Sequence, residues 1–310
     1  MNAQSSTVPE FGADAPASAP AATAPTRPLY WSIRREFWES RSIFIAPLAV
    51  AALVLLALLV SAVRLPQGVR LLEALDPARR DAIIAGAFGM AAFPITITTF
   101  LVAVFYCLGA LHNERRDRSI LFWKSLPVSD LVTVVSKASI PLVIIPIVTV
   151  VIIIATRLIM LLMGTAVVAA NGLSLAPLWD HPPLLQLSLV PLYGVAVQTL
   201  WYAPIYGWLM LVSGWARRAP FLWAVIPPLA LCLFEKIAFH TSYLTSMLEN
   251  RLTGSDAAAF VDGGPNAVIY KLAQLDPAKF VATPGLWIGL AIAAVLFAAA
   301  VWLRRYRDPV

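Results

Sequence analysis

The side chains best suited to ionic chemistry are crowded into one short stretch of an otherwise apolar chain. The segment His112–Lys137 (HNERRDRSILFWKSLPVSDLVTVVSK) begins with mixed acidic and basic residues and continues with an apolar, aromatic middle. This mixture fits either a basic loop with an interfacial helix at the cytoplasmic membrane surface or a docking surface for a soluble partner. Pro127 predicts the end of a short helix over 119–126, because proline lacks an amide hydrogen. Ser129 and Asp130 are placed to cap the helix that follows.

Residue patterns typical of enzymes are missing from the sequence. It contains no G-x-x-x-x-G-K-[ST], no Gly-rich dinucleotide fingerprint, no H-E-x-x-H and no G-x-S-x-G. The adjacent pair Asp180 and His181 has no further ligands near it, and both cysteines, Cys107 and Cys232, fall inside apolar runs. We therefore predict no catalytic residue, no bound cofactor and no metal site, and no ATP hydrolysis by this chain itself.

Three ionisable side chains interrupt the apolar runs: Arg157, Glu235 and Lys236. Arg157 is expected near the outer end of a membrane span, where its charged group reaches the interface. A carboxylate inside a span is costly and is usually paired. We therefore predict that Glu235 faces protein, with Arg157 or Lys236 as its partner. Few other polar groups are expected to converge within the spans.

Composition places the chain in the membrane. Its 310 residues are 60% hydrophobic and only 13% charged, about half the charged fraction of globular proteins. The net charge of +6 comes from arginines at the ends of apolar runs, which fits membrane orientation and not nucleic-acid binding. We predict an all-α polytopic protein with six spans, each near the ~20 residues that a bilayer requires. The spans are expected at about 43–63, 83–111, 132–163, 188–212, 220–240 and 285–303.

The remaining segments suggest how the spans are arranged. Residues 1–28 are rich in Ala, Pro, Ser and Thr and are expected to be a disordered cytoplasmic tail. Residues 29–42 alternate apolar and charged faces, which predicts an amphipathic interfacial helix before the transmembrane domain of 43–307. Basic residues near span ends favour cytoplasmic N- and C-termini and a cytoplasmic loop at 112–130.

Two segments are then expected on the outer side. Residues 241–284 form a long extracytoplasmic segment, with short surface helices at Asn266–Leu275 and Ala278–Val281. The 64–82 loop, RLPQGVRLLEALDPARRDA, is also assigned outside, with a surface helix over Val69–Leu75. Its four arginines run against the usual excess of basic residues on the cytoplasmic side.

The charged stretch resembles a known family. The run E-R-R-D-R-S-I-L-F-W-K-S-L-P-V-S, with a lysine entering the third span, is similar to the loop after the second span in permease subunits of type 2 ATP-binding-cassette (ABC-2) exporters. The resemblance extends over about residues 30–307, although Ser119 stands where the family often has Thr. The matching positions are Glu114, Arg115, Arg118, Ser119, Phe122, Ser125, Leu126, Pro127, Val128, Ser129 and Lys137.

The resemblance implies a permease of the inner membrane that works as a homodimer or heterodimer and forms a translocation path. A separate ABC ATP-binding subunit, which holds ATP and Mg, would dock near 112–130 through a coupling helix; residues 29–42 would be the elbow helix. Alternatives are an intramembrane enzyme acting on lipid or peptide, and a secondary transporter or membrane anchor. The residues that the resemblance implies as coupling contacts are Glu114, Arg115, Arg118, Phe122, Trp123 and Lys124.

Overall fold

The all-α prediction is confirmed. A computed structural model describes residues 28–73, 75–117, 119, 128–173, 184–261 and 272–306. Throughout these ranges the regular structure is helical, apart from one isolated β-bridge between Phe260 and Leu275. Six stretches are long and apolar enough to cross a membrane, close to the predicted spans: Ser42–Leu71, Ala82–Arg116, Asp130–Ala170, Ser188–Trp215, Pro220–Phe239 and Pro284–Tyr306.

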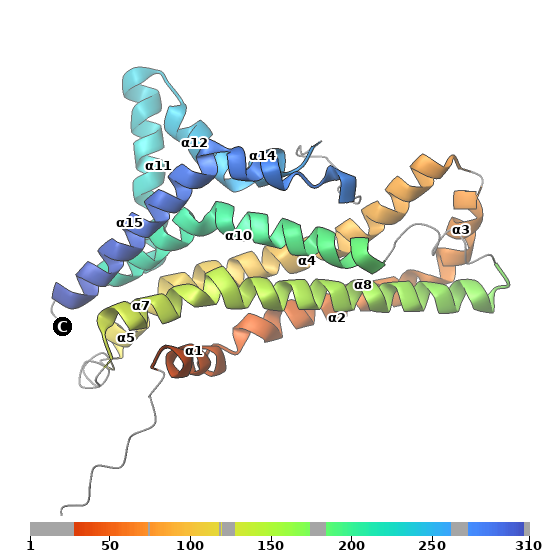
Figure 1. Cartoon of the computed structure of the whole chain (residues 1–310), viewed down its shortest axis with the longest axis horizontal. Coiled ribbons are helices and arrows are strands. Elements are labelled where there is room, and N and C mark those ends of the chain that lie inside the picture. Colours follow the sequence, from red (N-terminus) through yellow and green to blue (C-terminus); the bar gives the residue numbers. More distant parts are fainter. Residues whose placement is uncertain are drawn as a thin grey trace, which may run out of the picture.

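Four long helices lie side by side and form the body of the molecule (Figure 1). They are α2 (Ser42–Ser61), α4 (Pro77–Ala110), α8 (Ile145–Ala170) and α10 (Leu184–Trp215). The sixth span, α15 (Pro284–Tyr306), packs against α10. The α10 helix is the most buried span, so it forms the centre of the bundle.

The third span changes its helix type at a pair of prolines. It begins with α7 (Asp130–Ser139), passes through the π-helix η2 (Ile140–Ile144) and continues as α8. Pro141 and Pro146 cannot donate backbone hydrogen bonds, and a π-turn accommodates the break in the ladder. The whole span has 41 residues, or about 60 Å at ~1.5 Å per residue. It therefore exceeds the ~30 Å hydrocarbon core and must tilt or project.

The fifth span, α11 (Pro220–Phe239), projects from the body formed by α2, α4, α8 and α10 and contacts it mainly through α10 (Figure 1). The residues on either side of it, Ala219 and His240, have left-handed backbone conformations with φ of 47° and 52°. These two turns set the direction of α11. The second turn leads into α12 (Tyr243–Thr253), which runs back toward the body of the molecule and contacts α10.

Short helices follow in the rest of the 241–284 segment. They are α13 (Ser255–Ala259), η3 (Leu272–Gln274) and α14 (Pro277–Ala282), and α14 covers the helix predicted at Ala278–Val281. Most of the other predicted helix, Asn266–Leu275, lies outside the described residues, and η3 falls in its last part.

The molecule has two ends of different character (Figure 1). The charged end gathers α1 (Pro28–Glu39), α5 (His112–Arg116), the start of α7 and the end of α15. The α3 end, at the opposite pole, carries η1 (Ala62–Arg64) and α3 (Leu65–Glu73). The loop at 64–82 therefore lies opposite α5, and its helix begins before the predicted Val69. The N-terminal tail up to residue 27 lies outside the described residues.

Candidate functional site

An ionic cluster joins four helices at the charged end. It contains three cations and three anions, so its formal charges balance. Four of its side chains are buried, with 4 to 8% of their residue surface exposed. A buried charge is tolerated only when it is paired and hydrogen-bonded, so this cluster must be held in a defined geometry. We call it the charged cluster: Arg35 and Glu36 from α1, Glu114 from α5, Asp130 and Lys137 from α7, and Arg304 from α15.

Lys137 is the central cation of the charged cluster. Its Nζ lies 2.8 Å from Oε1 of Glu36 and 3.1 Å from Oε1 of Glu114. The other oxygen of Glu36 accepts a 2.9 Å hydrogen bond from the hydroxyl of Tyr106 on α4. One ammonium group thus links α1 to α5 and to α7.

Arg304 brings the last span into the same cluster. Its guanidinium lies 2.5 Å from Oε2 of Glu114 and 3.0 Å from Oδ1 of Asp130. Arg35 donates to Glu36 at 2.8 Å from the more exposed side. Asp130, predicted as a helix cap together with Ser129, uses its carboxylate for Arg304, whereas Ser129 accepts from the amide of Val132 as a cap should.

The end of α10 holds α5 in place. The hydroxyl of Ser213 accepts hydrogen bonds from the backbone amides of Leu111, at 3.0 Å, and His112, at 2.9 Å. The guanidinium of Arg115 donates to the carbonyl of Gly214 at 2.5 Å. Because the hydroxyl of Ser213 and the carbonyl of Gly214 both bond to this segment, α5 is tied to the fourth span as well.

The acid limb of the pH–stability profile is expected to depend on Glu36. Burial raises the pKa of the Glu36 carboxyl. The charge and hydrogen bond of Lys137, together with Tyr106 and Arg35, lower this pKa by more than burial raises it, so it lies below its usual value of 4.5. Its stabilising contribution is therefore complete above pH 4.5 and is lost as pH falls through the lower, folded-state pKa. Unfolding midpoints between pH 7 and 3 should fall more steeply for the wild type than for Glu36→Gln. The exposed Glu39→Gln should follow the wild type, and parallel curves for Glu36→Gln and wild type would contradict this assignment.

The predicted coupling residues are only partly within the described ranges. Glu114 is buried in the charged cluster and Arg115 is half-buried against α10. In this conformation Glu114 therefore contacts Lys137 and Arg304 and does not present its carboxylate to a soluble partner. The other four, Arg118, Phe122, Trp123 and Lys124, lie outside the described residues.

Glu235 is buried, as predicted, but its partners differ from those predicted. Its carboxylate accepts hydrogen bonds from the amides of Tyr243 (2.7 Å) and Leu244 (2.8 Å) and from the hydroxyl of Thr241 (2.8 Å). No ion pair with Arg157 or Lys236 is found among the described side chains. The free amides at the start of α12 provide the partial positive charge that a cation was expected to supply.

The two predicted cationic partners lie elsewhere. Lys236 is exposed on α11, and Arg157 is half-buried on α8. The basic residue that does connect elements in this region is Arg251 of α12. Its guanidinium donates to the carbonyl of Gly285 at 2.9 Å and lies over the ring of Trp201, 4.5 Å from the ring centroid. It thereby fixes α12 against α10 and α15.

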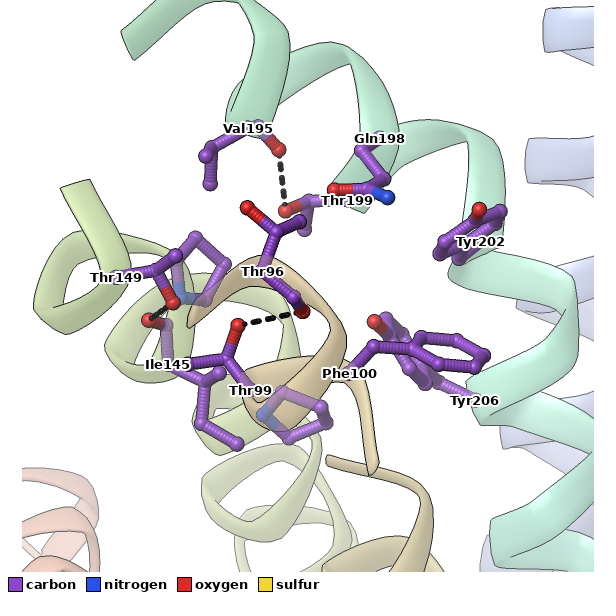
Figure 2. A pocket seen from close by; sticks show the side chains of 12 residues that line it. Thr96, Thr99, Phe100, Ile145, Thr149, Val195, Gln198, Thr199, Tyr202 and Tyr206 are labelled. Carbon is purple, nitrogen blue, oxygen red and sulfur yellow. Dashed lines mark hydrogen bonds between the residues drawn. The ribbon is translucent and has the colours of Figure 1, made fainter. Parts of the chain in front are cut away.

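A small polar cavity lies between α4, the third span and α10 (Figure 2). Its volume of about 20 Å³ suffices for a single water molecule. The hydroxyls of Thr99, Thr149 and Thr199 each donate to a carbonyl of their own helix, which leaves their lone pairs as acceptors. The expectation that few polar groups converge within the spans is therefore wrong at this point. The polar lining residues are Thr96, Thr99, Thr149, Gln198, Thr199, Tyr202 and Tyr206.

This cavity suits hydrogen bonding and not acid–base chemistry. None of the twelve described residues that line it is Asp, Glu, His, Lys, Arg or Cys. Within the described part of the chain, no group of three or more His, Cys, Asp or Glu residues could hold a metal ion.

Comparison with known proteins assigns no family to the chain. No protein-family model, no curated protein and no solved structure matches it.

Proposed function

We propose that this chain is the membrane-spanning permease subunit of an ABC-2-type exporter, with its charged end in the cytoplasm. The proposal is supported by the six candidate spans, by the resemblance of the 114–129 run and by the basic residues gathered at the charged end. The single observation that carries it is the charged cluster, which connects both sides of the resembling loop to the interfacial helix and to the sixth span.

The mechanism follows from how the loop is held. Residues 117–129 join α5 to α7, and these two helices are tied to each other by the ion pair of Glu114 with Lys137. A force applied to the loop would therefore move α5 and α7 together. Arg304 extends the connection to α15, and Lys137 extends it to α1 through Glu36. Ion pairs have discrete alternative partners, so such a cluster is suited to two arrangements that a partner could favour differently.

The proposed permease works together with partner chains. The energy source is a separate ATP-binding subunit that holds ATP and Mg and docks on the loop. Two permease chains, identical or related, enclose the translocation path in the cell membrane. The polar cavity does not favour an enzyme, because the described residues that line it include no nucleophile–base pair.

Purification of the tagged chain from its own membranes tests the proposal. We expect a second polypeptide with a P-loop sequence to copurify and the complex to hydrolyse ATP. Trp123→Ala in the loop should reduce recovery of that subunit roughly tenfold or more, because buried aromatic residues dominate interface energies. The matched control is Trp302→Ala, an exposed tryptophan on α15. Recovery of stable, correctly inserted permease without any ATPase, or an equal loss of the ATPase in both variants, would overturn the proposal.

A further inference from the structure

The α3 end carries four arginines that the proposed function leaves unexplained. They are Arg64, Arg70, Arg79 and Arg80, and three of them are exposed while Arg80 is half-buried. The ion pairs found among the described side chains involve none of these four. Their position, opposite the charged end, also runs against the usual bias of basic residues toward one side of a membrane. The segment 64–82 also contains the acidic residues Glu73, Asp76 and Asp81, so its formal charge is +1, and this excess of arginine favours an anionic ligand.

An apolar cavity lies among the same elements. Its volume is about 240 Å³, and it is lined by residues of α2, η1, α3, α4 and α8. Every described residue that lines it is aliphatic, phenylalanine, methionine or glycine. An apolar cavity of ~150 Å³ in other proteins stays dry and takes up benzene, so water is a poor occupant for this larger one. Hydrocarbon fits it. The lining residues are Leu58, Ala62, Leu65, Gly68, Val69, Ile83, Ile84, Ala87, Phe88, Met160, Leu161, Met163, Gly164 and Val167.

The arginines border this cavity along the chain. Arg64 directly precedes the lining residue Leu65, and Arg70 directly follows the lining residue Val69. The other two arginines lie about one helical turn before Ile83, the first lining residue of α4. On both α3 and α4, arginines thus lie within one helical turn of residues that line the cavity.

We propose that the α3 end binds one anionic phospholipid of the bilayer, with an acyl chain in the cavity and the phosphate held by the arginines. Arginine suits this role because its planar guanidinium pairs with phosphate oxygens through two parallel hydrogen bonds. A zwitterionic lipid would fill the cavity equally well but would bring no net charge to the four arginines. The site is therefore selective for headgroup charge, and it does not depend on the proposed export function.

Native mass spectrometry of the full, delipidated chain tests the site. The probes are dioleoyl phosphatidylglycerol, which is anionic, and dioleoyl phosphatidylcholine, which is zwitterionic. We expect one phosphatidylglycerol per chain, bound more tightly than phosphatidylcholine. The double substitution Arg64→Gln with Arg70→Gln should weaken phosphatidylglycerol binding roughly 30-fold and leave phosphatidylcholine binding unchanged, given the usual contribution of each basic residue near a lipid surface.

A second substitution tests the cavity separately from the charge. Gly68 lines the cavity and a Cβ placed there meets no atom within 4 Å, so Gly68→Leu is accommodated and is expected to reduce the space for an acyl chain. It should weaken binding of both lipids. Gly89→Leu on α4, which has the same open space but does not line the cavity, and Arg305→Gln at the charged end should leave both unchanged. Equal binding of the two lipids by the wild type would overturn the proposal, as would an unaltered preference in the double variant or unaltered binding in Gly68→Leu. If the double variant does not fold, Arg79→Gln applies the same test of charge.

Discussion

Replacing Lys137 with methionine is expected to lower the free energy of unfolding by about 3–5 kcal/mol. The substitution keeps the length and apolar character of the side chain and removes only its charge. It leaves two buried carboxylates, those of Glu36 and Glu114, without the ammonium that lies 2.8 and 3.1 Å from them. The loss of a shared partner is costly because the remaining like charges cannot be solvated. Chemical denaturation of the purified protein in detergent measures the change.

Two further variants separate the effect of the lost charge from nonspecific destabilisation of the protein. Lys236→Met removes an exposed lysine from α11 and should change stability by less than about 0.5 kcal/mol. Glu36→Gln in the Lys137→Met background should recover part of the loss, because one of the two carboxylates that lost the ammonium is then neutral. The resulting double-mutant cycle should give a coupling energy of about 0.5–3 kcal/mol between the two residues. Additive effects would mean that the ion pair contributes nothing of its own.

The same variant bears on the proposed coupling. Replacement of a buried ionic network by apolar side chains is often neutral or stabilising in other proteins, so stability alone does not account for its presence here. A network of ion pairs can instead break and re-form between two arrangements. We expect Lys137→Met to uncouple ATP hydrolysis from transport even under conditions in which the protein stays folded, because α5, α7 and α1 would no longer move as one unit.

The spans were predictable, and the charged cluster was not. Long apolar runs set the positions of the spans, because only a helix satisfies its own backbone in lipid. The pairing within the cluster joins residues that are far apart in the chain: Lys137 is 101 residues from Glu36, and Arg304 is 190 residues from Glu114. A single sequence carries no signal for such pairs. Glu114 is an example. Its place in a charged run predicted an exposed contact residue, whereas in the structure it is buried among cations from three other helices.

The error at Glu235 has a different physical origin. A carboxylate inside a span is usually paired, so a cation was the expected partner. The α11 helix instead ends shortly after this residue, at Phe239, and the left-handed turn at His240 brings the start of α12 back to it. Backbone amides then act as the partner. This geometry depends on one φ angle, which the residue types alone do not determine.

Substitution of Glu235 by alanine is therefore expected to release the start of α12. The change removes three hydrogen bonds to one carboxylate, at 2.7 to 2.8 Å, and leaves two backbone amides without an acceptor. We expect a loss of stability, because the hydrogen bonds to the charged carboxylate disappear and water replaces only some of them. Hydrogen exchange should accelerate at the amides of Tyr243 and Leu244.

Two control variants test whether that loss comes from the contact between Glu235 and the start of α12. Glu235→Gln retains one carbonyl oxygen and should lose about half as much stability, whereas Glu249→Ala removes an exposed carboxylate from the same helix and should have little effect. Because α12 also carries Arg251, which binds α10 and α15, loosening its start should spread to those contacts. If exchange in α12 is unchanged in Glu235→Ala, the carboxylate does not hold this helix.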